Sequence, residues 1–153
     1  MPDTGDIAPA FTLPRDGGGQ VSLADFAGKP VVVYFYPRDD TPGCTTEASD
    51  FTAEAAAFAA LDVAVIGVSK DTVKSHDKFR DKHALAVILA SDADGDTAER
   101  FGVWGEKSMY GKTFLGIERA TFLIGPDGRI ARVWRKVKVA GHAAEVLAAA
   151  RAL

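Results

Sequence analysis

Cysteine is nearly absent from this sequence, since Cys44 is the only one among 153 residues. A lone cysteine excludes a disulfide within the chain and a zinc site built from cysteines. It also excludes the paired Cys-x-x-Cys motif of a typical disulfide oxidoreductase. A free thiol is typical of proteins in a reducing compartment, so we expect a cytoplasmic protein.

Long apolar runs and an excess of positive charge are also missing. No apolar run approaches the roughly 18 residues of a membrane-spanning helix, and the acidic residues 1–6 do not resemble a signal peptide. A formal net charge of −3 argues against nucleic acid or anionic membranes as partners. With 47% hydrophobic and 25% charged residues, the chain is typical of a globular protein. We therefore expect one domain over residues 1–153.

The surroundings of Cys44 suggest a reactive residue. An apolar run at 31–36 reads as a buried strand, which Pro37 ends. Residues 41–43, Thr-Pro-Gly, then supply a helix start, so Cys44 falls in the first helical turn. A helix N-terminus favours an anion, and a thiolate is such an anion. The pattern predicts a nucleophile; the alternative is an inert packing cysteine, which alkylation rates would distinguish.

The order of apolar patterns predicts an α/β fold, with a mixed central sheet flanked by helices and preceded by an N-terminal β-hairpin. The expected strands lie at 10–13, 20–23, 31–36, 62–68, 86–90, 120–124 and 129–134. The expected helices lie at 44–60, 71–83 and 96–101 and from about residue 141, the last burying Val146, Leu147, Ala150 and Leu153. We see no linker and no apolar stripe that demands a partner, which favours a monomer.

Two segments show no pattern that indicates a functional site. Residues 102–118 carry four glycines without a clear period and are expected to form a long loop. The acidic residues 92–96 lack the EF-hand spacing, because Thr97 and Val103 stand where glycine and glutamate are needed. We expect no metal there but a solvated loop and a helix cap. Three large aromatic side chains are expected to be packing residues rather than a platform for a cofactor: Trp104, Phe114 and Trp134.

A cysteine nucleophile is often activated by a histidine. His76 and His83 fall on a polar helix and His142 precedes the last helix, so we expect all three at the surface. A Cys–His hydrolase therefore has no support from a local signature.

The motif Pro37-x-x-x-Thr41-x-x-Cys44, followed by an arginine just before a strand, resembles that of the peroxiredoxins. More narrowly, the chain resembles the bacterioferritin comigratory protein, or peroxiredoxin Q, subfamily over almost its full length. The stretches that carry the resemblance are Gly5-Asp6-Ile7-Ala8-Pro9, Tyr34-Phe35-Tyr36-Pro37, Thr41-Pro42-Gly43-Cys44-Thr45, Phe101-Gly102-Val103-Trp104-Gly105-Glu106-Lys107-Ser108 and Gly116-Ile117-Glu118-Arg119-Ala120-Thr121-Phe122-Leu123-Ile124.

This resemblance implies a thioredoxin-like fold and a thiol-specific peroxidase that needs no metal, haem or flavin cofactor. Cys44 would be the peroxidatic thiolate, which hydroperoxides oxidise to a sulfenic acid. Thr41 would hydrogen-bond the thiolate and the peroxide, and Arg119 would favour the thiolate and stabilise the leaving oxygen. Pro37 would shield the pocket from water, and Glu47 would orient Arg119.

The chain departs from many members of the subfamily at Ser49, where they carry a second, resolving cysteine. The helix at 71–83, the other place for such a cysteine, contains none. Ser49 is either natural or an engineered replacement. In both cases an external thiol, from thioredoxin, glutaredoxin or glutathione, would resolve the sulfenic acid. The alternative functions are a peroxide-sensing thiol protein and a thiol-disulfide carrier with low peroxidase turnover.

Overall fold

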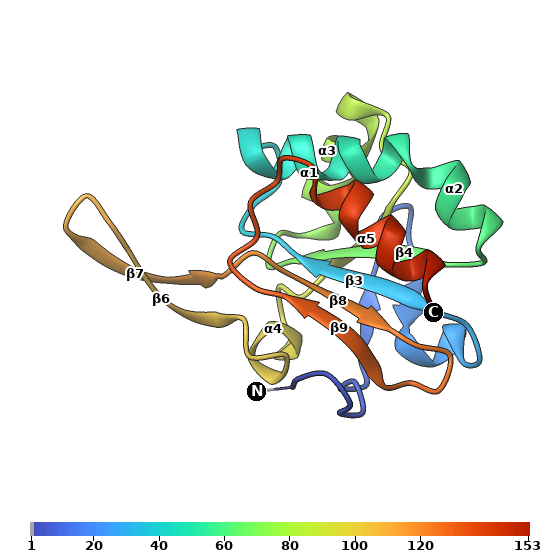
Figure 1. The fold of residues 1–153 in the computed structure, drawn as a ribbon. Coiled ribbons are helices and arrows are strands. Elements are labelled where there is room, and N and C mark those ends of the chain that lie inside the picture. Colours follow the sequence, from blue (N-terminus) through green and yellow to red (C-terminus); the bar gives the residue numbers. More distant parts are fainter. Residues whose placement is uncertain (1) are drawn as a thin grey trace.

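The computed structural model describes residues 2–153 (Figure 1). Its central sheet has the strand order β5-β4-β3-β8-β9. The pairs β3–β4 and β4–β5 are parallel, whereas β8 runs antiparallel to both β3 and β9. The strands are β3 (Val31–Phe35), β4 (Ala64–Ser69), β5 (Ile88–Ser91), β8 (Ala120–Ile124) and β9 (Ile130–Trp134). The predicted mixed sheet of an α/β fold is confirmed.

Strand β3 is central because it is apolar on both faces, and every one of its residues is buried. Its side chains alternate between two apolar clusters. Val33 and Phe35 belong to the cluster on one face of the sheet, and Val32 and Tyr34 to the cluster on the other. The end of β3 is thereby fixed in the core, and the segment that leads to Cys44 starts from it.

Helices cover the two faces of the sheet unequally (Figure 1). Four of them contribute buried side chains to the Tyr34 face: α1 (Pro42–Ala53), α2 (Ala55–Ala60), α3 (Val73–His83) and α5 (His142–Arg151). The opposite face carries α4 (Thr97–Arg100), the 3-10 helix η1 (Leu23–Phe26) and the N-terminal strand pair β1 (Thr12–Pro14) and β2 (Gln20–Ser22). The predicted N-terminal hairpin is present, with β1 antiparallel to β2.

The helix expected over 44–60 is divided at Glu54. The backbone N–H of Glu54 still bonds to the carbonyls of Asp50 and Phe51, but its ψ of 6° lies outside the helical range. The buried stripe nevertheless continues across the break, since Phe51 and Phe58 are both fully buried. The division changes the direction of the chain without exposing the core.

The segment 102–118 is not a loop. It forms an antiparallel hairpin of β6 (Trp104–Met109) and β7 (Lys112–Ile117), which projects from the body of the molecule (Figure 1). Tyr110 and Gly111 make the two-residue turn with positive φ angles of 53° and 75°, the geometry that fits tightly twisted hairpins. Gly111, one of the four glycines that obscured the pattern, thus makes the turn of the hairpin.

This hairpin also exposes large apolar side chains, whereas the sequence showed no apolar stripe that demands a partner. Phe114, predicted to be a packing residue, is 43% exposed, and Met109, Tyr110 and Leu115 are exposed as well. The monomeric state remains a prediction.

Two smaller expectations also fail. Leu153 is exposed because the last helix ends at Arg151. Asp92 is fully buried rather than solvated, whereas residues 93–96 are exposed as expected. Asp92 accepts hydrogen bonds from the backbone N–H groups of Thr97 and Ala98, so the expected helix cap is present at the start of α4. Across residues 2–153, the structure contains no helix with the length and apolar character needed to cross a membrane.

Candidate active site

Cys44 lies at the start of helix α1, which follows strand β3 in the chain. Thr41 is the N-cap residue, and Pro42 occupies the first helical position, where its missing N–H costs nothing. Cys44 therefore lies in the first turn, near the positive end of the helix dipole. Its side chain is a free thiol and only 1% exposed. The predicted placement in the first helical turn is confirmed, and the thiol is sheltered from solvent.

Arg119 reaches this thiol from the junction between β7 and β8. Its Nη2 donates a hydrogen bond to Cys44 Sγ at 3.3 Å. The absence of a side chain at Gly43 permits this approach, because a Cβ there would lie 3.1 Å from Nη2. A guanidinium at this distance places a fixed positive charge beside the sulfur. The structure thus brings together the two residues that sequence reasoning paired.

Glu47 holds the other side of the same guanidinium, one helical turn after Cys44. Arg119 Nη1 donates to Glu47 Oε1 at 2.6 Å, which is the contact expected from the sequence. Glu47 is only 1% exposed, and among the described residues its Oε2 has no hydrogen-bond partner. Burial raises the pKa of Glu47 to about 7, although Arg119 acts in the opposite direction. One cation therefore faces two groups that can each carry a negative charge.

Glu47 makes the stability of the fold depend on pH. Its pKa rises from 4.5 to about 7, so between these values the folded protein holds a proton that the unfolded chain has released. The stabilisation is complete below pH 4.5 and is lost as the pH rises to about 7. We expect a loss of about 3 kcal/mol in the unfolding free energy, and Glu47→Gln should remove this loss.

Urea unfolding at intervals between pH 4 and pH 8 measures the effect as the difference between wild type and Glu47→Gln. Glu145→Gln is the matched control, because Glu145 is an exposed glutamate paired with Arg132. Parallel pH profiles for wild type and Glu47→Gln would contradict the assignment.

Thr41 and Pro37 flank the site differently from Arg119. We expected the Thr41 hydroxyl to donate a hydrogen bond to the thiolate. Instead, Thr41 Oγ1 donates its single proton to the carbonyl of Arg38 at 2.9 Å. The hydroxyl oxygen keeps its lone pairs for accepting a hydrogen bond. Pro37 is half-buried at the end of β3 and presents no N–H group.

The histidines depart from their predicted surface positions. His76 is fully buried, and His142 is 4% exposed, with its Nε2 at 2.8 Å from Thr121 Oγ1. Burial lowers the pKa of His142. Only His83 is partly exposed. Among the described residues no histidine hydrogen-bonds Cys44, so the site contains no Cys–His pair.

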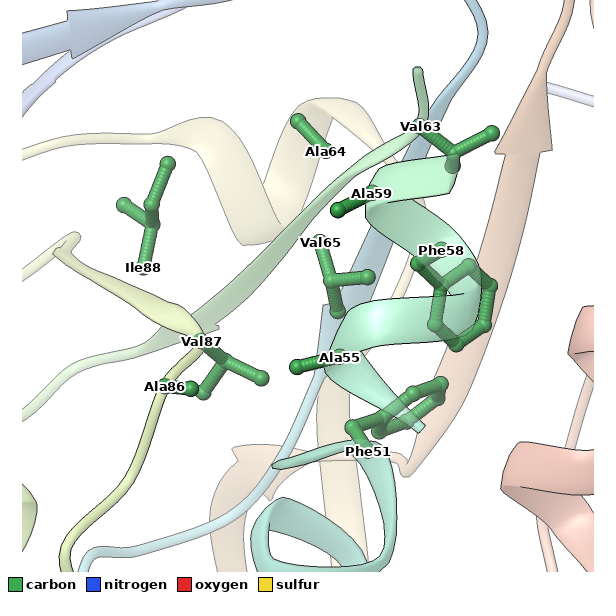
Figure 2. A pocket seen from close by; sticks show the side chains of 10 residues that line it. All are labelled: Phe51, Ala55, Phe58, Ala59, Val63, Ala64, Val65, Ala86, Val87 and Ile88. Atoms are coloured by element: carbon green, nitrogen blue, oxygen red, sulfur yellow. The ribbon is translucent and has the colours of Figure 1, made fainter. Parts of the chain in front are cut away.

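An apolar cavity lies apart from this site, between α2 and the strands β4 and β5 (Figure 2). Its volume is about 290 Å³, and its lining includes Ala55, Phe58, Val65 and Val87. Neither Cys44 nor Arg119 lines it. Within residues 2–153 no group of three or more side chains is arranged to hold a metal ion.

Comparisons with known proteins identify the family of this chain. The model of the AhpC/TSA family matches residues 4–133. Peroxiredoxin Bcp of Bacillus subtilis is 50% identical over 145 residues, which cover 95% of this chain and 92% of the relative. Peroxiredoxin Bcp of Xanthomonas campestris is 52% identical over 147 residues, 95% of this chain and 92% of the relative. The chain belongs to the AhpC/TSA family and is a peroxiredoxin.

Solved structures support the same assignment. The bacterioferritin comigratory protein of Xanthomonas campestris, studied for alkyl peroxide reduction, has a TM-score of 0.88 at 51% identity, covering 93% of this chain and 90% of its own. A cysteine-to-serine mutant of peroxiredoxin Q from Xylella fastidiosa has a TM-score of 0.93 at 41% identity, covering 99% of this chain and 97% of its own. The fold of this peroxiredoxin is therefore thioredoxin-like, and the protein is a thiol peroxidase of the oxidoreductase class.

Sequence reasoning missed two features of the segment that leads to Cys44 in this peroxiredoxin. Gly43 was interpreted only as part of the turn and helix start, and its role in admitting Arg119 depends on a contact with a residue 76 positions away. The second feature is the buried contact between His76 and Asp39, which hydropathy could not indicate because both side chains are polar. The sequence Tyr36-Pro37-Arg38-Asp39, in which an aspartate follows a buried strand, was the one available hint of a polar network.

Proposed function

We propose that this chain reduces hydrogen peroxide and organic hydroperoxides at Cys44, acting as one domain in the cytoplasm, with an external thiol as the reductant. The observation that carries the proposal is the 3.3 Å contact between Arg119 Nη2 and Cys44 Sγ at the start of α1. A helix N-terminus and a guanidinium together surround one sulfur with positive charge.

In the oxidation step the Cys44 thiolate attacks the terminal oxygen of the hydroperoxide. An S–O bond forms as the O–O bond breaks, so that sulfur loses two electrons and the peroxide gains them. The leaving oxygen departs as hydroxide or alkoxide and takes up a proton to become water or an alcohol. Arg119 stabilises the negative charge that develops on this oxygen.

Thr41 and Pro37 take supporting roles in the proposed step. Because Thr41 donates its proton to the Arg38 carbonyl, its oxygen is free to accept the hydrogen bond of the peroxide O–H group. This contact turns the terminal oxygen toward the sulfur. Pro37 adds an apolar ring without a donor, which keeps one side of the pocket dry.

The reduction step needs a thiol from outside the chain. Ser49, at the usual position of a resolving cysteine, is exposed and carries no thiol. A first external thiol condenses with the sulfenic acid to a mixed disulfide and releases water. A second thiol then attacks that disulfide, which frees Cys44 and leaves the reductant oxidised. Thioredoxin, glutaredoxin and glutathione are the proposed reductants.

Peroxide consumption under multiple turnover tests the cycle. We expect steady consumption with at least one of the three reductants and a single equivalent consumed without any. Mass spectrometry after one equivalent of peroxide should show the Cys44 peptide heavier by one oxygen, or joined to the added thiol. Unmodified protein with the peroxide left in solution would contradict the proposal.

A further inference from the structure

His76 is engaged at both ring nitrogens although it is fully buried. Nδ1 lies 2.7 Å from Asp39 Oδ2, and Nε2 lies 3.0 Å from the carbonyl of Ala90. His76 and Asp39 are thus joined by a buried hydrogen bond between helix α3 and the segment that follows β3. Buried polar contacts rarely improve stability over apolar packing, which points to a role in fixing one conformation.

Asp39 is held by more than His76. Its side chain is 3% exposed, and it accepts hydrogen bonds from Tyr36 Oη at 2.6 Å and from Ser75 Oγ at 2.8 Å. Its backbone N–H donates to Asp71 Oδ2 at 2.8 Å. The end of β3 and the start of α3 therefore converge on one carboxylate.

This carboxylate lies in the middle of the segment that carries the proposed chemistry. Asp39 is two residues from Pro37 and two from Thr41. The carbonyl of Arg38, next to Asp39, accepts the hydroxyl proton of Thr41 at 2.9 Å. The carbonyl of Thr41 in turn accepts the backbone N–H of Thr45 at 2.9 Å, in the turn that holds Cys44. A shift of Asp39 would therefore also move the Thr41 hydroxyl and the Cys44 sulfur.

We infer that the Asp39–His76 pair is a positioning unit, which fixes residues 37–41 so that Thr41 and Cys44 present the peroxide in line. This inference rests on the proposed peroxidase function. The pair touches no substrate and acts through the backbone between β3 and α1. In-line displacement depends steeply on placement, and a shift of about 1 Å can cost on the order of a hundredfold in rate.

Stopped-flow oxidation of Cys44 by hydrogen peroxide tests the inference. Asp39→Asn and His76→Gln each replace one member of the buried hydrogen-bonded pair by an amide of similar size. We expect each to lower the second-order rate constant at least about tenfold at temperatures where circular dichroism shows a folded protein. Asp40→Asn is the matched control in the same segment, because Asp40 makes only exposed contacts, with Lys82 and His83. It should stay within about twofold of wild type.

Alkylation by iodoacetamide separates positioning from general damage. This reagent needs an accessible thiolate but no alignment with Thr41, so its rate should be unchanged or higher in both variants. Peroxide rates equal to wild type in the folded variants would overturn the inference. So would a fall in alkylation that matches the fall in peroxide rate.

Ser75→Ala covers the case in which neither Asp39→Asn nor His76→Gln folds. It deletes one donor to Asp39 from a half-buried side chain, and we expect a fall in peroxide rate of about threefold. No change in this folded variant would overturn the inference. If wild-type Cys44 reacts no faster than free cysteine, the proposed function itself fails, which is a distinct result.

Discussion

Cys44→Ser is expected to reduce peroxide consumption to that of buffer without protein. The serine hydroxyl fits the same place in the first turn of α1, but it is not ionised near neutral pH and cannot take part in the sulfur chemistry. The measurement is peroxide consumed over time with each reductant present. We expect the variant to fold, because serine is close in size to the cysteine it replaces.

Ser49→Ala is the matched control for this loss. Ser49 lies on the same helix, is exposed, and has no thiol to contribute. Its replacement should leave the rate unchanged. Consumption at the wild-type rate by Cys44→Ser would contradict the assignment of the reacting sulfur.

Arg119→Ala is expected to slow the oxidation of Cys44 more than tenfold, which corresponds to over about 1.4 kcal/mol of transition-state stabilisation. The variant loses the Nη2 donor at 3.3 Å from Cys44 Sγ and with it the positive charge beside the leaving oxygen. Stopped-flow mixing with hydrogen peroxide gives the rate constant directly. Near-wild-type rates would remove Arg119 from the mechanism.

Two further variants are controls for Arg119→Ala. Arg132→Ala removes the same charge from an exposed arginine that pairs with Glu145, and it should leave the rate unchanged. Loss of Arg119 also leaves Glu47 buried without its cation. The double variant Arg119→Ala/Glu47→Gln removes that unpaired group, so a rate that stays low in it reflects the lost guanidinium rather than a damaged fold.

The central sheet and the place of Cys44 could be predicted from the sequence because both depend on local patterns. The run at 31–36 is apolar on both faces, which only a buried central strand requires. Pro42 and Gly43 mark the helix start through their own backbone preferences. The contact between Arg119 and Cys44 could not be predicted from local patterns, because the two residues lie 75 positions apart. Only the resemblance to a family linked the two.

The failures have two physical causes. The helix that carries His76 is mostly polar, so hydropathy placed the histidine at the surface; a buried carboxylate on another segment compensates for its burial. The hairpin at 104–117 has little alternation to detect, because most of its residues are exposed on both faces. Contacts between polar groups far apart in the sequence leave no periodic trace.

The rate of a single oxidation of Cys44 by hydrogen peroxide tests the account most directly, when it is compared with that of free cysteine at the same pH. The account predicts that the folded protein reacts at least about a hundredfold faster, because Arg119 and the helix N-terminus are already in place around the sulfur. A rate constant equal to that of free cysteine would contradict it.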